Sequence, residues 1–159
     1  TALDRDAAVP CDLQFWEQHL DRLVGNWEGR LIEVRRHLHA NPEPSREEWE
    51  TSKFLAEQLT AGGLDARLCR DGLGVIADAV LGRPPADGPV IAVRADIDAL
   101  RIQDTKTTPY ASIRPGLSHA CGHDAHTAML IGTAKAPVFR TPKYIGSHSR
   151  QFMSRIATL

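Results

Sequence analysis

Apolar side chains recur at spacings of three and four residues through the first quarter of the chain, which is the period of an amphipathic α-helix. These positions are Leu13, Trp16, Leu20, Leu23, Trp27, Leu31, Val34 and Leu38. The pattern predicts one long helix over about residues 12–40, or two helices that meet near Gly25. We expect the stripe to pack in a core. The sequence NPEP at 41–44 ends the helix, because proline lacks a backbone donor and restricts the residue before it.

A second helix is predicted after this break. Ser45 and Glu48 have the S-x-x-E spacing of a capping box, in which each side chain satisfies a free backbone N–H at the start of a helix. The helix is expected to bury Trp49, Leu55 and Leu59. It should stop at the glycine pair 62–63, since glycine readily adopts the left-handed conformation that ends helices.

Three strands and a third helix follow in the pattern. Alternating residues at 64–70 and 75–81, joined by the turn sequence DGLG, predict a hairpin. The nearly continuous apolar run at 90–93 is typical of a strand buried on both faces, so we expect this strand to be central. Residues 101–117 read as a long loop, and 123–134 as a helix packed on the sheet. The order of elements predicts an α/β fold.

Charge divides the chain at residue 134. The whole chain has 159 residues and a formal charge of −1, which is ordinary for one domain. Residues 1–134 hold 14 basic and 20 acidic residues, whereas residues 135–159 hold five basic residues and no acid. We therefore predict two parts, with 135–159 as a divergent basic tail. The tail reads as the end of a truncated or out-of-frame product, or alternatively as a natural tail that packs on a sheet edge or binds an acidic partner.

Candidate metal ligands gather just before the third helix. Cys121 and His123 offer a thiolate and an imidazole, which suit Zn²⁺ and other first-row divalent ions. A catalytic zinc site usually takes three protein ligands, so further donors must come from elsewhere. His119, Asp124 and His126 are candidates for ligands, substrate contacts or capping groups.

Polar residues also follow the third predicted strand, at the strand end where open α/β sheets place ligand sites. Asp96 is placed to orient a ligand histidine or to bridge metals, because carboxylates next to a metal site fix the tautomer and orientation of its ligands. Alone, Asp96 and Asp98 would be solvated acids, and Arg94 an ion-pair partner for them or a substrate contact. The sequence RRHLH at 35–39 reads as the polar face of a helix end.

Four blocks of sequence, in order and at matching spacing, resemble the M20 metallopeptidase family. They are RRHLHANPEPSREEWET (35–51), GLGVIA (72–77), IAVRADIDAL (91–100) and SHACGHDAHTAMLIGTA (118–134). They are most similar to its amidohydrolase branch, which contains hippurate hydrolases, N-acyl-amino-acid amidohydrolases and plant indole-acetyl-amino-acid hydrolases. The resemblance covers about residues 30–134.

The resemblance implies a three-layer, zinc-peptidase-like catalytic domain with a mixed central sheet, and a separate lid domain that often mediates dimerisation. It implies hydrolysis of the amide bond of N-acyl amino acids with two divalent ions, Mn²⁺ or Zn²⁺. Cys121 and His123 match the first two metal ligands of the branch. Asp96 matches an orienting aspartate, and Arg94 stands where the wider family has a ligand histidine, as is usual in this branch.

Residues 135–159 depart from the family. A strand ending in a Glu-Glu pair, which supplies the general base and a ligand, is expected there and is not found; later histidine ligands and the lid are missing too. The chain is therefore expected to contain only part of the catalytic domain, to bind a metal weakly and to hydrolyse little alone. The alternative is a non-catalytic binding or regulatory remnant.

The remaining expectations concern the cellular location and the partners of the protein. Three widely spaced cysteines suit reduced thiols and, with no signal-peptide pattern, a cytoplasmic protein. An N-acyl amino acid is the expected small-molecule partner of the parent family, and the resemblance implies that full-length relatives can form homo-oligomers through the lid that is missing here. No membrane or nucleic-acid partner is expected.

Overall fold

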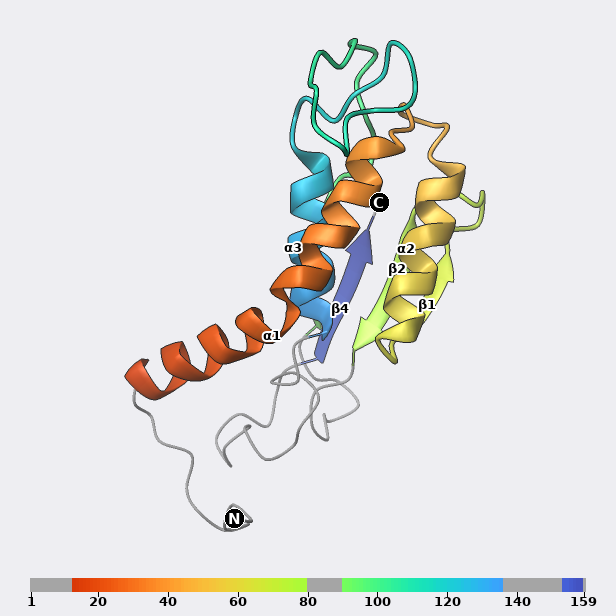
Figure 1. The fold of residues 1–159 in the computed structure, drawn as a ribbon. Coiled ribbons are helices and arrows are strands. Elements are labelled where there is room, and N and C mark those ends of the chain that lie inside the picture. Colours follow the sequence, from red (N-terminus) through yellow and green to blue (C-terminus); the bar gives the residue numbers. More distant parts are fainter. Residues whose placement is uncertain (1–12, 80–89, 136–152, 159) are drawn as a thin grey trace.

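The computed structural model describes residues 13–79, 90–135 and 153–158. The elements are α1 (Leu13–Ala40), α2 (Trp49–Ala61), β1 (Asp65–Leu68), β2 (Val75–Ala79), β3 (Val90–Val93), α3 (His123–Lys135) and β4 (Met153–Thr158). The three helices and the first three strands were all predicted, and β4 was not. Figure 1 shows the helices gathered beside one twisted sheet.

The first helix is continuous through Gly25, so the prediction of a single long helix is confirmed. Its two ends differ in burial. Val34 and Leu38 are buried at 2% exposure each, whereas Leu20 is 43% exposed and Val24 is 58% exposed. The expected core stripe is therefore right for the C-terminal part and wrong at Leu20. Figure 1 shows the reason, because the N-terminal part of α1 projects beyond the other described elements.

The second helix begins without the predicted capping box. Its N-cap residue, Glu48, makes no side-chain cap hydrogen bond. Instead the buried carboxylate of Glu43 accepts hydrogen bonds from the backbone N–H groups of Glu50 (3.3 Å) and Thr51 (2.7 Å). Trp49 is 47% exposed, so its predicted burial is also wrong. The predicted stop at the glycine pair is confirmed, with Gly63 at φ 77°.

The sheet is mixed, as predicted. Its strand order is β1-β2-β4-β3, with β1 and β4 antiparallel to β2 and with β3 parallel to β4. The predicted hairpin is confirmed by the pairing of β1 with β2, and Gly72 and Gly74 between them have positive φ.

The third strand does not have the central position predicted for it. It lies at one edge of the described sheet, and β4 is its neighbour on the inner side. Ala92 is exposed and Val93 is 38% exposed, so burial on both faces is wrong for these two residues. The physical reason is that an apolar run reports the tendency to be buried but names no neighbour that would bury it.

Residues beyond 134 contribute to the sheet through β4. Its backbone lies between β2 and β3, in register from Val75↔Thr158 on one side and Val90↔Met153 on the other. Residues 136–152 lie outside the described part. The division of the chain into 1–134 and 135–159 stays a prediction.

One hydrophobic cluster joins all three helices to β2. It includes Val34 and Leu38 of α1, Leu55 and Leu59 of α2, Val75 and Ala77 of β2, and Ala128 and Ile131 of α3. The helices α1 and α3 approach closely, because a Cβ built on Gly132 would lie 2.9 Å from a methyl carbon of Leu31. Among the described residues, no helix combines the length and apolar character needed to cross a membrane.

Candidate metal centre

Three segments meet at one end of the molecule: the chain after β3, the loop of residues 101–122 and the start of α3. Figure 1 shows this loop beyond the C-terminal end of α1. Isolated bridges hold it in place, pairing Pro44 with Ala99 and Leu100 with Ser118. The predicted ligand region therefore lies where the polar strand end and the predicted loop come together.

His123, the first residue of α3, is held by Asp98. Its Nδ1 lies 2.9 Å from the Asp98 carboxylate oxygen Oδ1 and 3.0 Å from the Asp98 carbonyl oxygen. Both oxygens are acceptors, so Nδ1 carries the proton and Nε2 is left with its lone pair. Metal-binding histidines commonly have such a carboxylate or carbonyl partner, which fixes the tautomer and the ring orientation.

Cys121 lies two residues before His123 and is an exposed, free thiol. Between them, Gly122 has φ 82°, a left-handed conformation that side chains rarely adopt. The carbonyl of Gly122 then accepts the N–H groups of Ala125 (3.0 Å) and His126 (3.1 Å), which begins the helix. The glycine thus lets the chain turn directly from Cys121 into the helix that carries His123.

Asp96 does not contact His123 in this arrangement. Its carboxylate pairs with the guanidinium of Arg94, and both side chains are substantially exposed. Its backbone carbonyl accepts a hydrogen bond from Thr127 Oγ1 (3.1 Å), which ties the end of β3 to α3. The orienting role predicted for Asp96 stays a prediction, whereas the carboxylate that orients His123 in this structure belongs to Asp98.

Asp124 follows His123 and is 1% exposed. Its Oδ2 lies 2.7 Å from Nδ1 of His39 and 2.9 Å from Nε of Arg35. Sequence reasoning missed these two residues, since RRHLH was read as an exposed polar helix end. A usable signal existed, because Arg35 and His39 are four residues apart and each directly follows a residue of the buried face, Val34 or Leu38.

His119 is buried at 5% exposure, and neither ring nitrogen has a hydrogen-bond partner in the part of the chain that the structure describes. Burial lowers the pKa of His119 to about 4, with the nearby Asp124 carboxylate acting in the opposite direction. Its ring centre lies 6.5 Å from that of His39. His126 is exposed, with its ring 6.4 Å from that of His123.

The donor chemistry at Cys121 and His123 fits a first-row divalent ion, and the neutral His123 tautomer presents Nε2 as a ligand atom. The set is small. Within residues 13–79, 90–135 and 153–158, no group of three or more His, Cys, Asp or Glu side chains is arranged to hold a metal. An ion bound here would polarise a carbonyl or activate a water.

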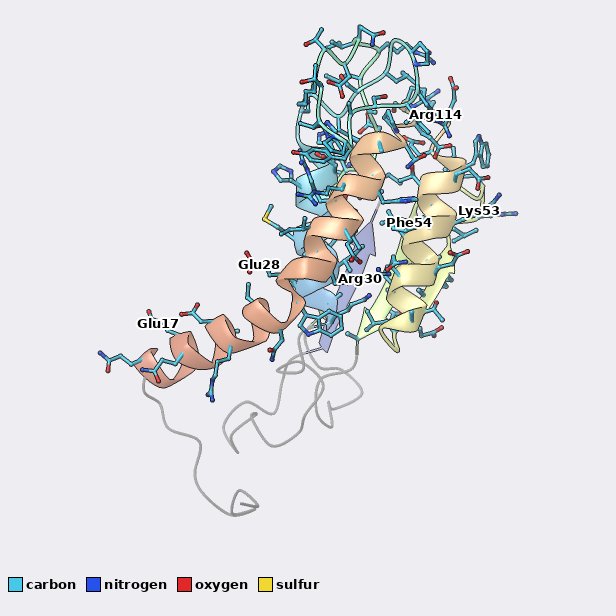
Figure 2. The ribbon with its side chains drawn as sticks, viewed as in Figure 1. Glu17, Glu28, Arg30, Lys53, Phe54 and Arg114 are labelled. Atoms are coloured by element: carbon cyan, nitrogen blue, oxygen red, sulfur yellow. The ribbon has the colours of Figure 1, made fainter. Side chains whose placement is uncertain are left out.

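A cavity of about 340 Å³ lies elsewhere, between the C-terminal part of α1 and α2. Its lining residues include Lys53, Phe54 and Arg114, which are labelled in Figure 2. Neither Cys121 nor His123 lines this cavity. The candidate metal ligands therefore do not lie in this cavity.

Comparison with known proteins agrees with the fold. Residues 92–138 match the family model of Peptidase family M20/M25/M40. An N-acyl-L-amino acid amidohydrolase of Geobacillus stearothermophilus is 45% identical over 119 residues, which are 75% of this chain and 31% of that protein. An N-acetyl-L-cysteine deacetylase of Bacillus subtilis is 50% identical over 107 residues, which are 67% of this chain and 25% of that protein.

Solved structures give the same result. A dinuclear metal-binding peptidase of the M20 family from Bacillus subtilis superposes with a TM-score of 0.72 at 41% identity, over 84% of this chain and 35% of that one. A putative aminohydrolase from methicillin-resistant Staphylococcus aureus gives a TM-score of 0.75 at 32% identity, over 89% and 35%.

The described fold is thus an α/β fold like that of the M20 peptidase from Bacillus subtilis, and residues 92–138 match Peptidase family M20/M25/M40. The two relatives named above are an N-acyl-L-amino acid amidohydrolase and an N-acetyl-L-cysteine deacetylase. The chain spans about a third or less of the length of these relatives.

Proposed function

We propose that the protein carries the first half of the metal site of an amidohydrolase that cleaves the amide bond of N-acyl amino acids. The observation that carries this proposal is the Asp98–His123 pair beside Cys121, an imidazole whose orientation is already fixed and a thiol two residues away. The substrate class follows from the relatives, which include an N-acyl-L-amino acid amidohydrolase and an N-acetyl-L-cysteine deacetylase.

Mn²⁺ or Zn²⁺ is the proposed ion. Thiolate and imidazole favour Zn²⁺ over Mg²⁺ or Ca²⁺, and Mn²⁺ is included because the resemblance to the M20 family implies it. A cytoplasmic location is proposed as well, supported by the free thiols of Cys69 and Cys121, which a reducing compartment preserves.

The chain as given is proposed to bind an ion weakly and to hydrolyse little. Residues 135–159 contain no Asp or Glu, so the Glu-Glu pair of the family has no counterpart there. General-base assistance typically contributes 10²–10⁴-fold to a rate. Asp96 is retained as the proposed orienting group, and its carboxylate pairs with Arg94 in this structure.

Metal titration tests this function directly. Calorimetric titration of Mn²⁺ or Zn²⁺ into the full chain should give binding that weakens at least tenfold in Cys121→Ser. Cys69→Ser is the matched control, because Cys69 is a free thiol outside the centre. Equal binding by the wild type and Cys121→Ser would remove the site assignment, and rapid chelator-sensitive hydrolysis of N-acetyl amino acids would overturn the proposed low activity.

A second candidate is a non-catalytic binding module. The exposed apolar residue Val93 favours it, since it lies on β3, the edge strand of the sheet formed by the described residues, and strand edges are templates for pairing with another chain. Light scattering separates the cases. Association that Val93→Lys abolishes would support a binding module, and a concentration-independent monomer would exclude pairing through this edge.

A further inference from the structure

A buried chain of polar side chains runs behind the metal centre, from α1 through the start of α3 to the loop. Arg35 and His39 of α1 both contact the Oδ2 atom of Asp124. On its other side, His39 Nε2 lies 3.2 Å from Nζ of Lys106 and 3.6 Å from Oδ2 of Asp104. The side chains of His39 and Asp124 are each 1% exposed, and that of Asp104 is 3% exposed.

The contacts define the direction of the hydrogen bonds. Asp124 is an acceptor, so the Nδ1–H group of His39 donates to it at 2.7 Å. Lys106 is a donor, so Nε2 of His39 accepts from it at 3.2 Å. A neutral His39 satisfies both bonds with one proton. The two bonds from Lys106 to His39 and from His39 to Asp124 run in one direction, and Arg35 donates to Asp124 from the other side, so this carboxylate accepts from both residues of α1.

The loop end of the chain is fixed as firmly as the helix end. The Asp104 carboxylate accepts hydrogen bonds from the backbone N–H groups of Lys106 (3.0 Å) and Ser112 (2.9 Å). These bonds hold the pKa of Asp104 below its usual range. The ionised carboxylate keeps Lys106 close, with Nζ 3.6 Å from Oδ1.

Asp124 connects this chain to the metal ligand. It lies in the first turn of α3, one residue after His123, and its contacts with α1 hold that turn in place. Asp98 holds the His123 ring through the hydrogen bond to Nδ1. The two carboxylates therefore constrain the same ligand by different routes, one through its backbone and one through its side chain.

We infer that His39 and Arg35 are positioning residues of the metal site, which set the place of His123 by clamping Asp124. This inference rests on the proposed metal binding by Cys121 and His123. The clamp joins residues 85 positions apart in the sequence, so it can be lost without touching any ligand.

Two substitutions of His39 separate this role from general stabilisation. The amide nitrogen of asparagine reaches about as far as Nδ1 of histidine, and that of glutamine about as far as Nε2. His39→Asn therefore keeps a donor to Asp124, whereas His39→Gln keeps only a group facing Lys106 and Asp104. Both variants fill the site with an amide and leave the core apolar residues unchanged.

The readout is Co²⁺ titration of the full chain, followed by the thiolate-to-cobalt charge-transfer absorption that reports ligation by Cys121. His39→Gln should weaken Co²⁺ binding about 10-fold and change the ligand-field spectrum at saturation, since loss of supporting partners costs 10–100-fold in metal affinity. His39→Asn should stay within about 3-fold of wild type with an unchanged spectrum. Equal losses in both variants, or a larger loss in His39→Asn, would overturn the inference.

Arginine variants provide a second test that does not depend on His39. Arg35 and Arg36 both lie over the Tyr110 ring, at 5.3 and 5.0 Å from its centre, but only Arg35 contacts Asp124. Arg35→Gln should weaken Co²⁺ binding several-fold, and Arg36→Gln should leave it unchanged. Equal effects would count against the clamp. If wild type itself gives no cobalt signal, the proposed metal binding fails first; if it binds through Cys121 and these variants bind equally well, only the clamp fails.

Discussion

Among the described residues, the pairs His39–Asp124 and His123–Asp98 look alike and differ in which ring nitrogens remain without a partner. His39 and Asp124 are joined at 2.7 Å with both side chains 1% exposed. His123 and Asp98 are joined at 2.9 Å with side chains 23% and 26% exposed. The first pair uses both ring nitrogens within the protein, whereas the second leaves Nε2 of His123 without a hydrogen-bond partner among the described residues. A buried histidine with both ring nitrogens bonded acts as a structural clamp, although the Oδ1 atom of Asp124 has no hydrogen-bond partner in the described part of the chain, and a partly exposed histidine with one free nitrogen can act as a ligand.

The largest expected effect breaks the buried pair. Asp124→Ala should lower the free energy of unfolding by about 3–5 kcal/mol, because it leaves Arg35 and His39 without the carboxylate that compensates their burial. Asp98→Ala, at the exposed pair, should cost less than about 1 kcal/mol. Urea denaturation of the metal-free protein measures both. Similar costs for the two variants would erase the distinction between the pairs.

A pH titration sharpens the comparison through a third histidine, His119, which is buried like His39 but has no partner among the described residues. Burial lowers the pKa of His119 to about 4, below the value near 6.5 in the unfolded chain. Between these values the unfolded state binds more protons, so the free energy of unfolding should fall as the pH drops from 7 to 4, by up to about 3 kcal/mol.

His119→Gln removes this titrating group. Urea denaturation at several pH values in the presence of a chelator should show a flatter dependence below pH 6.5 than in wild type. An unchanged slope would assign the acid sensitivity to other groups.

Breaking the exposed pair of His123 and Asp98 should weaken metal binding. Asp98→Asn keeps the size of the side chain but removes the charge that holds the Nδ1 proton of His123. Mn²⁺ or Zn²⁺ binding should weaken about 10–100-fold, or about 1.4–2.7 kcal/mol, while urea stability without metal stays within about 1 kcal/mol of wild type. Asp96→Asn is the control for the neighbouring carboxylate that does not contact His123, and a larger effect there would exchange the two roles.

The smallest expected effect concerns a carboxylate with no histidine partner. Glu43→Ala removes the acceptor for two backbone N–H groups at the start of α2 and should cost about 1 kcal/mol, the usual value of a helix cap. Glu48→Ala should cost much less, because Glu48 makes no cap hydrogen bond. Thermal unfolding of the two variants compares them directly.

Local patterns in the sequence were sufficient for the helices and the hairpin. The three-and-four spacing gave α1, and the glycines at 62–63 and 72–74 ended or turned the chain where expected. The capping box was wrong because a competing acceptor, Glu43, lies outside the four-residue window that the motif inspects. The sequence correctly indicated a helix start near this position, but it did not identify Glu43 as the residue that accepts the free N–H groups.

Long-range pairings were beyond the sequence. The sequence RRHLH does not indicate that His39 contacts Asp124, which is 85 positions away. The sequence placed Asp96 and Asp98 on the same strand end but could not choose between them, because both have the same parity along the chain. The position of β3 at the edge of the described sheet was missed for the same reason, since an apolar run does not specify its neighbours.

The place of β4 also determines the order in which this fold can assemble. Its backbone separates β2 from β3, and the pairing Val75↔Thr158 joins residues 83 positions apart. The β1–β2 hairpin and α2 are local and can form early, but the two halves of the sheet stay unconnected until residues 153–158 arrive. Non-local strand pairing of this kind slows folding, because loop closure costs entropy before any contact is gained. The slow step in refolding should therefore be the insertion of β4 between β2 and β3.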